Sequence, residues 1–498
     1  MADAVLAGGY DNFGDLLEAA ASDYPDQVAF VSGGTRFSYA QWYQQALLVA
    51  GALARRGVTA GDVVALTLPN GIDFAVGYAA GLLLGAVVTA VNTRLGVTEV
   101  AGILGRAGAA AVIAPEGPDP RVDAVYDGLL VRMAELADSV PLRHRPAVAA
   151  DAPAIIVWTS GTTGAPKGAW FDHAGLAAAV PSSGLLSAPF DRRLMPVPFA
   201  HSGFMTRVWD QVAFVISSVI TPVPWTVEAM LDSLVSERVT VGQGVPAQWE
   251  KVLRRLDGRT RLPDLRVIGT GSTRVPAELV RGLREQLGVP VLSRYACTEV
   301  PIISGTRPDD PPEILERTVG RGQDGIAIEV LDESRQPLPA GSVGRVAVRS
   351  RFRMRGYWKD PEQSAAVLTP DGWFVSSDLG WLDADGNLTL AGRSGEVYIR
   401  GGYNVYPLEV ENVLTAHPAV LAAAVVGVPA PVIGEIGVAY VVPVPGEQPD
   451  LAGLRAWCAA RIADYKAPDR LELVAELPLS STLKVDKRAL ARRAAAAR

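Results

Sequence analysis

The strongest constraint on the fold is a regular alternation of short apolar runs with helix-forming segments. Val63–Leu68, Val87–Val91 and Ala110–Ala114 are apolar runs of strand length, and a segment of helical pattern separates each run from the next. Before them, Val28–Val31 and Thr35–Phe37 flank a Gly-Gly pair and indicate a hairpin. Strands that alternate with helices form parallel sheets covered on both faces. The sequence therefore predicts an α/β fold.

The pattern changes towards the C-terminus, which indicates further domains. At roughly 150 residues per domain, a chain of 498 residues holds about three domains or one large domain with a small companion. Short strands and turns dominate residues 325–390, as in a β-rich subdomain, and a compact α+β tail follows. We therefore expect an N-terminal domain at 1–394, made of an α/β core (1–324) and the β-rich subdomain (325–390), and a C-terminal domain at 395–498.

Composition narrows the class of protein. The net charge is −7, from 46 basic and 53 acidic residues, which argues against a nucleic-acid binder. The two cysteines, Cys297 and Cys458, are too few for a disulfide framework and fit a cytoplasmic protein. The acidic N-terminus lacks the basic region of a signal peptide. Glycines interrupt the apolar stretch Phe74–Val91, so we expect a buried helix followed by a strand rather than a membrane span.

The strongest local signal is the segment Thr159–Gly168, which follows a predicted strand. It holds four hydroxyl residues, three glycines and Lys167. Glycines allow backbone N–H groups to turn towards an anion, and hydroxyls and a lysine add further donors and charge. Lys167 is followed by glycine rather than Ser or Thr, so the segment is not a Walker A loop. It predicts a phosphate-binding loop; the alternative is a flexible polar loop.

Other motifs are weak when taken alone. The segment Tyr295–Glu299 follows a predicted strand, where ligands bind in open α/β sheets. Its tyrosine could stack on a purine, and its hydroxyl and carboxylate could hold a phosphate and Mg²⁺. Asp378, Arg393 and Lys484 stand in short motifs of equally low specificity.

Taken in order, these motifs resemble those of the adenylate-forming superfamily of acyl-CoA synthetases, peptide-synthetase adenylation domains and beetle luciferases. The resemblance runs from about residue 13 to 490 and is most specific at Thr159–Gly168 and Gly392–Glu411. It implies a large adenylation domain, a small mobile C-terminal domain and a two-step reaction. A carboxylate attacks the α-phosphate of ATP to give acyl-AMP and pyrophosphate, and a thiol then attacks the acyl-AMP. The chain looks most like an AMP-forming acyl-CoA ligase that uses ATP, Mg²⁺ and CoA.

The resemblance also implies roles for individual residues. Around the β- and γ-phosphates it places Thr159, Ser160, Gly161, Thr162, Thr163, Gly164 and Lys167. Around the adenosine it places Gly269, Thr270, Gly271, Ser272, Tyr295, Ala296, Asp378 and Arg393. Thr298 would contact the α-phosphate, Glu299 would bind Mg²⁺, and Lys484 would neutralise charge during adenylation. Gly402 and Tyr403 would line the tunnel for pantetheine.

Three positions depart from the family pattern. Ala296 and Leu483 replace glycines, and both changes narrow the space near the nucleotide. Gly395 stands where the family has Asp or Lys as the hinge between domains. We expect Gly395 to serve as a permissive hinge, with an ordinary turn as the alternative.

The predicted acid pocket is apolar. His201 stands in a motif whose histidine lines the carboxylate pocket in the family, and Ser202 replaces the Asp that pairs with the ammonium of amino acids. Because a buried unpaired ammonium is costly, amino acids are disfavoured. The expected wall comprises Phe204, Met205, Trp209, Gly242 and Gly244, and its glycines would leave room for a bulky aryl, medium-chain or polycyclic acid. Arg207 could meet a second carboxylate, although a surface role is the simpler interpretation.

CoA is the expected acceptor because the chain has no carrier-protein domain. The alternative is a stand-alone acyl-AMP ligase that loads a carrier protein, for which the short spacing from Gly380 to Gly392 shows no insertion. Lys484 and Glu299, which a catalytically dead homologue would lose, are present. The sequence leaves open which acid is activated and whether the chain is a monomer or a homodimer.

Overall fold

The computed structural model describes residues 9–136, 139–159, 166–256, 260–273, 275–480 and 484–496. The chain divides into two compact units. Unit 1 holds residues 1–328 and 348–374, and unit 2 holds residues 329–347 and 375–498. The division therefore runs through the predicted β-rich subdomain, while a domain border at residue 395 stays a prediction.

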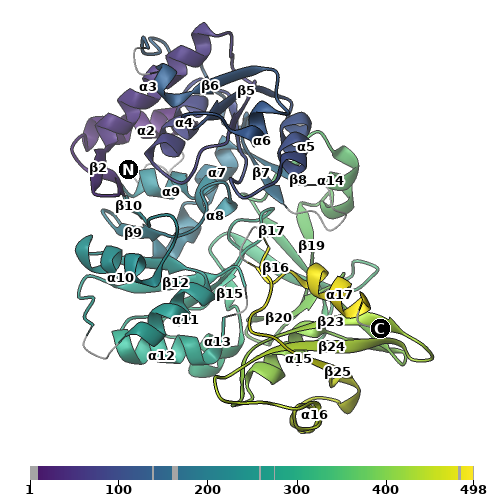
Figure 1. Cartoon of the computed structure of the whole chain (residues 1–498). Helices are drawn as coiled ribbons and strands as arrows, with labels where there is room; N and C mark the ends of the chain where they lie inside the picture. The colour runs from purple at the N-terminus through teal and green to yellow at the C-terminus, as the bar shows by residue number, and fades with distance from the viewer. Residues whose placement is uncertain are drawn as a thin grey trace. The chain divides into compact units, whose positions relative to one another are not determined.

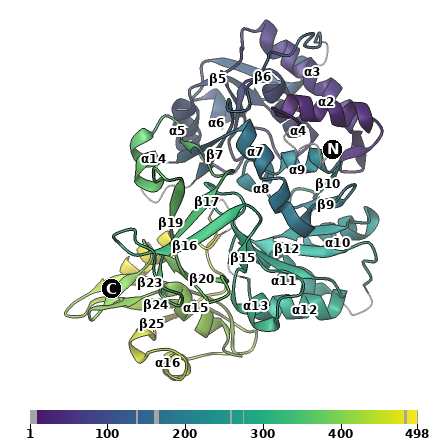
Figure 2. The same cartoon turned by 180° about the vertical axis from the view of Figure 1, so that it is seen from behind.

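Unit 1 contains a seven-stranded sheet (Figures 1 and 2). Its order is β18-β8-β7-β4-β3-β5-β6, and the strands from β7 to β6 are parallel, as predicted. β8 and β18 add an antiparallel edge. The strands are β3 (Val63–Leu66), β4 (Val87–Ala90), β5 (Ala109–Ala114), β6 (Leu129–Arg132), β7 (Pro153–Thr159), β8 (Lys167–Asp172) and β18 (Gly356–Tyr357).

Helices cover both faces of this sheet. α3 begins at Tyr39, and the preceding Ser38 caps it in a reciprocal capping box with Gln41. α4 is buried along most of its length and precedes β4, which confirms the buried helix and strand predicted at residues 74–91. Within the described residues, no helix is long and apolar enough to cross a bilayer. The helices are α2 (Phe13–Asp23), α3 (Tyr39–Arg55), α4 (Ile72–Leu83), α5 (Val97–Ala107), α6 (Pro120–Asp123), η1 (Met133–Leu136), α7 (His173–Ala178) and α14 (Pro361–Val367).

A nine-stranded sheet forms the rest of unit 1, in the order β15-β14-β13-β12-β11-β9-β10-β1-β2. The predicted hairpin β1–β2 is confirmed, but it joins this second sheet, because Phe30 pairs in parallel with Ser218 rather than with the nearby strands. The strands are β1 (Val28–Ser32), β2 (Thr35–Ser38), β9 (Arg192–Met195), β10 (Ser217–Ile220), β11 (Val241–Gly244), β12 (Val267–Gly271), β13 (Val291–Tyr295), β14 (Ser304–Gly305) and β15 (Arg321–Gly322).

The two faces of this sheet have different covers. One face is covered by α10 (Val227–Ser236), α11 (Pro246–Arg255), α12 (Ala277–Leu287) and α13 (Pro312–Arg317) (Figure 1). The fully buried Trp249 of α11 belongs to the core beneath these helices. Truncating such a side chain costs about 3–5 kcal/mol. On the other face Leu186 packs on Val241, Val267 and Leu292. Leu186 ends the 3₁₀ turn η2 (Pro181–Leu186), and α8 (Ser202–Met205) and α9 (Val208–Ala213) follow later in the chain.

The four-stranded sheet β16-β17-β19-β20 contains the strands at which the two units divide. Its strands are β16 (Ile326–Leu331), β17 (Gly344–Ser350), β19 (Trp373–Leu382) and β20 (Leu388–Arg393).

The rest of unit 2 is a small α+β body, as predicted. β23 and β24 pair along ten residues of register, and Tyr398, Val425 and Val441 belong to its core. The elements are β21 (Tyr398–Arg400), β22 (Tyr403–Val405), α15 (Pro407–Thr415), β23 (Val420–Ala430), β24 (Gly434–Pro443), α16 (Leu451–Ala459), η3 (Asp464–Lys466), β25 (Arg470–Leu473) and α17 (Lys487–Ala496).

Candidate active site

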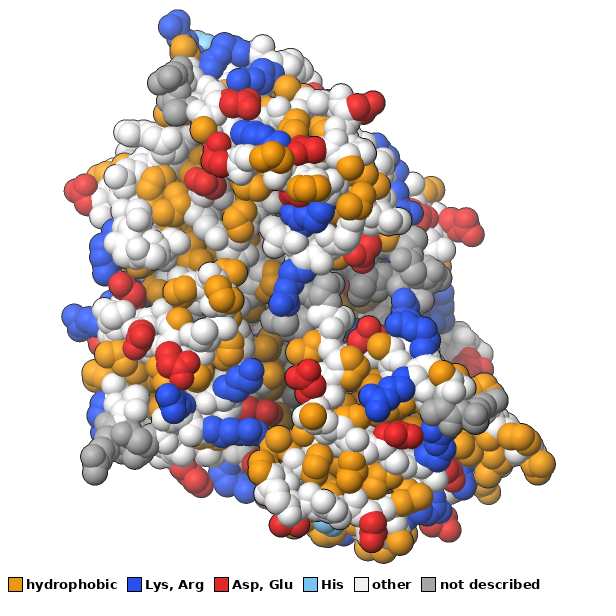
Figure 3. All heavy atoms as spheres, in the orientation of Figure 1, with side chains coloured by type: hydrophobic (Ala, Val, Ile, Leu, Met, Phe, Trp, Pro, Cys, Tyr) orange, Lys and Arg blue, Asp and Glu red, His pale blue; other side chains and the backbone are white. Residues whose placement is uncertain are grey.

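Charges of both signs are mixed over the face seen in Figure 3. On this face, a polyanionic ligand would therefore have to be held by a local cluster of donors rather than by a broad basic surface.

The predicted phosphate loop joins β7 to β8. Thr159 and Lys167 are register partners at the open end of this antiparallel pair. Ser160, Gly161, Thr162, Thr163 and Gly164 lie outside the described residues. Gly168 has a packing role, because an added Cβ would lie 2.7 Å from Ile156 Cγ2.

Lys167 points towards two residues that sequence analysis did not single out. Its Nζ donates to Gln363 Oε1 at 2.6 Å and lies 5.2 Å from the centre of the Tyr357 ring. Tyr357 is on β18, which pairs with β8. Gln363 lies 196 residues after Lys167 in the sequence, so a distant segment of the chain holds the lysine at the loop.

Tyr357 also connects Lys167 to Glu299. The tyrosine hydroxyl donates to Glu299 Oε1 at 2.8 Å, and the backbone N–H of Met354 donates to the Glu299 carbonyl at 2.7 Å. Burial, and then the Glu299 charge, raise the pKa of Tyr357 well above its usual value. Tyr357 therefore remains a hydrogen-bond donor at neutral pH. The structure thus brings together Lys167 and Glu299, which the sequence placed in separate motifs.

The predicted adenine-binding segments end side by side. β12 and β13 are parallel neighbours, with Thr270 opposite Ser293 and Gly271 opposite Arg294. A Cβ at Gly271 would lie 2.1 Å from the Arg294 carbonyl oxygen, so this close backbone approach requires glycine. Ser272 has a left-handed φ of 69°. Within the described residues Thr270 Oγ1 is buried without a hydrogen-bond partner.

The motif after β13 turns back on itself. Tyr295 is 8% exposed, and the Cys297 N–H donates to the Val300 carbonyl. Ala296 is exposed, and Thr298 is half-buried. Their predicted contacts with nucleotide stay predictions.

His201 lies against Asn92, at the end of β4. The Asn92 side-chain amide is 3.0 Å from His201 Nε2, and Asn92 Oδ1 accepts a hydrogen bond from the Arg94 N–H. Because the oxygen of Asn92 is engaged by Arg94, its Nδ2 faces the histidine as a donor. His201 Nε2 is then an acceptor, which assigns the neutral ring with its proton on Nδ1.

Three expected members of the acid pocket pack deep in unit 1. Phe204 stacks on Phe199 with ring centres 3.7 Å apart, and Met205 is fully buried. Trp209 is fully buried and meets Phe13 edge-on at 5.7 Å. Their contact with an acid stays a prediction.

The glycines in the expected pocket make room for the chain's own side chains. An added Cβ at Gly242 or Gly244 would lie 2.8 Å from the Trp249 ring, and at Gly269 it would lie 2.9 Å from Leu186. Strand alternation explains this, because Gly242 and Gly244 share the face that α11 covers. The interpretation that these glycines leave space for a bulky acid is therefore not supported by their surroundings.

In unit 2, Asp378 and Arg393 form an ion pair, with Nε 2.9 Å from Oδ1. They are register partners on β19 and β20. The sequence placed both near the ribose without showing that they touch.

The remaining predicted residues of unit 2 lie in or next to turns. Gly402 has a φ of 87° in the β21–β22 turn, and Tyr403 stacks on Tyr465 at 4.5 Å. Lys484 is exposed, and its carbonyl accepts a hydrogen bond from the Ser480 N–H at 2.7 Å. An added Cβ at Gly395 would meet nothing within 4 Å.

Comparison with known proteins identifies the class. The sequence matches the family described as AMP-binding enzyme over residues 17–358 and the AMP-binding enzyme C-terminal domain over residues 409–484. Feruloyl-CoA synthase of Amycolatopsis sp is 33% identical, with 94% of this chain and 96% of that protein covered. A 3-[(3aS,4S,7aS)-7a-methyl-1,5-dioxo-octahydro-1H-inden-4-yl]propanoyl:CoA ligase of Rhodococcus jostii is 30% identical, with 95% and 97% covered.

Solved structures of related enzymes have the same fold and support the same class. ATP-bound MatB from Rhodopseudomonas palustris superimposes with a TM-score of 0.89 at 27% identity, covering 97% of this chain and 99% of that one. MenE, the o-succinylbenzoate CoA synthetase of Bacillus subtilis, in complex with an acyl-adenylate, has a TM-score of 0.86 at 26% identity, covering 95% and 97%.

The chain belongs to the AMP-binding enzyme family and is an AMP-forming acid–CoA ligase. It activates a carboxylic acid with ATP as acyl-AMP and transfers the acyl group to CoA. The predicted family and fold class are confirmed, and the alternative of loading a carrier protein is not favoured.

Proposed function

We propose that the acid is hydrophobic and bulky, with an aryl, medium-chain or polycyclic skeleton. The names of several relatives support this class: a feruloyl-CoA synthase, an indoleacetate–CoA ligase of Aromatoleum aromaticum and the octahydroindenyl-propanoyl ligase. The observation that carries the adenylation half of the proposal is the cluster of Lys167, Tyr357 and Glu299. This cluster places a cation, Lys167, and a carboxylate group, Glu299, at the end of the predicted phosphate loop.

We infer that Lys167 and the loop at 159–164 hold the β- and γ-phosphates. Lysine and backbone donors at such a loop stabilise the negative charge of the phosphates. Gln363 and the Tyr357 ring fix the direction of Lys167, so its charge is preorganised rather than collected during the reaction.

Glu299 suits Mg²⁺. Its carboxylate is an acceptor-only group, and one of its oxygens already has the Tyr357 donor. Within the described residues, no three His, Cys, Asp or Glu side chains gather as a ready-made metal site. Mg²⁺ in nucleotide enzymes is commonly held by one or two carboxylates together with phosphates and water, which fits one glutamate. When bound, Mg²⁺ would neutralise phosphate charge.

For the nucleoside, we propose that Tyr295 stacks on the adenine beside the segment 269–272 and that Ala296 lies close to it. Thr298 would contact the α-phosphate. Asp378, oriented by Arg393, would accept hydrogen bonds from the ribose hydroxyls. His201 would line the carboxylate pocket as a neutral ring held by Asn92.

Lys484 would neutralise charge during adenylation, and Gly402 and Tyr403 would line the pantetheine path for the second step. We propose that residues 395–498 move between the two steps. A cytoplasmic location is proposed from the low number of cysteines.

A panel of carboxylic acids with ATP and CoA tests the function. Pyrophosphate release scores the first step, and the mass of acyl-CoA scores the second. We expect both with aryl or polycyclic acids. Release of pyrophosphate without a thioester would contradict CoA as the acceptor, and efficient use of short acids alone would contradict the proposed substrate class.

A further inference from the structure

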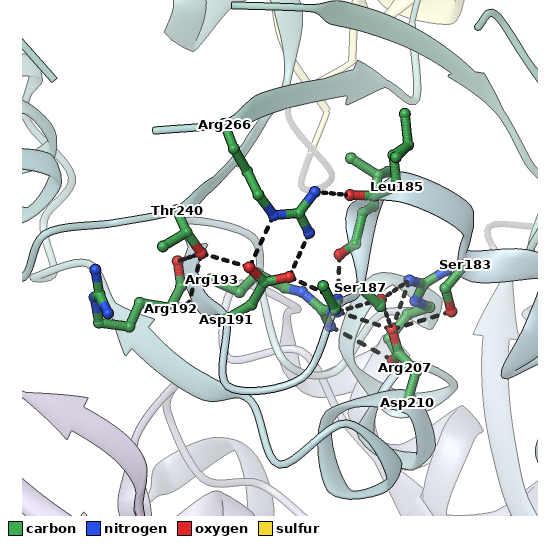
Figure 4. A network of polar contacts seen from close by, with 12 residues as sticks. Ser183, Leu185, Ser187, Asp191, Arg192, Arg193, Arg207, Asp210, Thr240 and Arg266 are labelled. Carbon is green, nitrogen blue, oxygen red and sulfur yellow. Dashed lines mark hydrogen bonds and ion pairs between the residues drawn. The ribbon is translucent and has the colours of Figure 1, made fainter. Parts of the chain in front are cut away.

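A buried network of charges lies beside the turn η2 (Figure 4). Its centre is Asp210 on α9, which is 2% exposed. Arg193 Nη2 lies 2.9 Å and Arg207 Nη2 lies 2.7 Å from Asp210 Oδ2. The hydroxyls of Ser183 and Ser187 donate to the same oxygen.

One carboxylate therefore serves two guanidiniums. Burial opposes ionisation of Asp210, but the charges of Arg193 and Arg207 hold its pKa at about 2. The pair of arginines thus leaves an excess of one positive charge at neutral pH. Within the described residues, Arg207 Nε is also buried without a hydrogen-bond partner.

A third arginine approaches the same turn from β13. The Nη2 atom of this residue, Arg294, lies 4.0 Å from the position that a Cβ would take on Gly184, within η2. Arg207 reaches the end of the same turn, where its Nη2 lies 3.4 Å from the hydroxyl oxygen of Ser187. Within the described residues Arg294 has no ion pair, and its Nη1 donates to the Thr306 carbonyl at 3.0 Å. Burial, and then the Arg207 charge, lower the pKa of Arg294 to about 10.

The sequence is adapted to this position of Arg294. Gly305 is its register partner on β14, and a Cβ there would lie 1.8 Å from Arg294 Nη1. Glycine at 305 therefore lets the arginine side chain pass across the neighbouring strand. Because a cation that has lost much of its hydration and has no ion pair within the described residues is costly, such an arrangement calls for an anion.

Both cations adjoin the predicted acid site. His201 stands just before α8 and Arg207 just after it, at the start of α9, where the Arg207 N–H donates to the Phe204 carbonyl. Arg294 immediately precedes Tyr295, and Leu186 of η2 fills the space above Gly269. Arg207 and Arg294 both remain partly exposed, so a ligand can reach them.

We propose that the acid activated by this enzyme carries a second anionic group, a carboxylate or a sulfonate, which Arg207 and Arg294 bind beside η2. The inference rests on the proposed function and makes its substrate class narrower. In this proposed arrangement the activated carboxylate lies near His201, and the carbon skeleton lies along the expected apolar wall. The second anion lies at the guanidinium groups of Arg207 and Arg294. Guanidinium groups bind such anions through paired, charge-assisted hydrogen bonds.

The test compares acids of equal skeleton with and without the second carboxylate. Octanedioate is paired with octanoate, and 4-carboxyphenylacetate with phenylacetate, and kcat/KM for pyrophosphate release is measured. The diacid should be preferred in at least one pair. In Arg294→Met the diacid-to-monoacid ratio should fall by roughly 10- to 100-fold, the loss expected for charge-assisted hydrogen bonds. Arg294→Lys should retain part of the preference.

Two further variants separate binding from structure. Gly305→Ala should displace the Arg294 side chain and lower the same ratio without removing a charge. Arg266→Gln is the matched control, because Arg266 Nη1 donates to the Leu185 carbonyl of η2 at 2.6 Å but pairs with Asp191. Its ratio should match the wild type.

Activation of monoacids with no preference for either diacid, or an unchanged ratio in Arg294→Met, overturns the inference and leaves the proposed function standing. Release of no pyrophosphate with any acid overturns both.

Discussion

The hydroxyl of Tyr357 donates a hydrogen bond of 2.8 Å to Glu299 Oε1. Tyr357 stands 58 residues after Glu299 and reaches it from the short strand β18. Because the same ring lies beside Lys167, one side chain orients both the expected metal ligand and the expected phosphate ligand. Tyr357 therefore acts as a positioning residue for the proposed nucleotide site.

Tyr357→Phe should raise the Mg²⁺ concentration needed for half-maximal pyrophosphate release. The ring and its contact with Lys167 remain, while Glu299 loses a donor that fixes its rotamer. A hydrogen bond to a charged group contributes about 1.5–3 kcal/mol, so kcat/KM should fall roughly 10- to 100-fold at limiting Mg²⁺. Glu299→Gln should have a larger effect, since an amide is a poorer ligand for a hard cation.

Tyr126→Phe is the matched control, because Tyr126 donates to the Ala109 carbonyl elsewhere in unit 1. An unchanged Mg²⁺ requirement in both Tyr357→Phe and Glu299→Gln would remove this pair from the metal site.

Lys484→Ala should slow adenylation by about 10²–10³-fold, as expected for the loss of one preorganised charge. Thioester formation from preformed acyl-AMP should change far less, because the lysine is proposed to face the α-phosphate only during adenylation. The two half-reactions are measured separately, with Lys251→Ala as a control on α11. Equal losses in both half-reactions would contradict the role of Lys484.

We expect protonation linked to His173 to lower the free energy of unfolding in mild acid. This histidine is fully buried, and its Nδ1 accepts a hydrogen bond from the Phe13 N–H at 3.3 Å. Burial lowers its pKa from 6.5 to about 4, against the charges of Asp172 and Asp15. Between these values the unfolded chain binds a proton that the folded chain does not, so stability is fully present above pH 6.5 and is lost as the pH falls towards 4.

The loss from His173 should be about 3 kcal/mol. Thermal unfolding of the wild type and His173→Gln between pH 7 and 4 measures it. The difference in stability between the two proteins should shrink as the pH falls, whereas a constant difference would show that His173 does not titrate as proposed.

The sequence predicted most of the secondary structure and the family, because local periodicity and contiguous motifs carry that information. It could not assign β1 and β2 to the second sheet, since their partner Ser218 lies far along the chain. It could not find Tyr357 either, whose role arises only when β18 pairs with β8.

The acid pocket shows a different limit of sequence reasoning. From the sequence, Gly242 and Gly244 suggest that space is left free next to the strand. The structure shows that the Trp249 side chain occupies this space. Likewise, the sequence favours a surface position for Arg207, whereas the structure places Asp210 and Ser187 in contact with its guanidinium group.

The surroundings of Gly395 restrict what this residue can do in the structure described here. Its φ is not in the left-handed region, and an added Cβ would meet no atom within 4 Å. The neighbouring residues are held: the Ser394 N–H donates to Ser377, and Glu396 pairs with Lys487 at 2.7 Å. This conformation alone therefore does not require glycine, and a requirement would come from a second arrangement.

Gly395→Ala and Gly395→Pro together test the hinge. Alanine fits the present conformation and should leave adenylation and thioester formation within about twofold, unless the second arrangement needs a positive φ. Proline fixes φ near −65° and should slow one half-reaction at least tenfold, about 1.4 kcal/mol of barrier, while the other stays near normal. Both half-reactions are measured for each variant. If proline slows the two in proportion, or slows neither, the rotation takes place at another residue and Gly395 is only a turn.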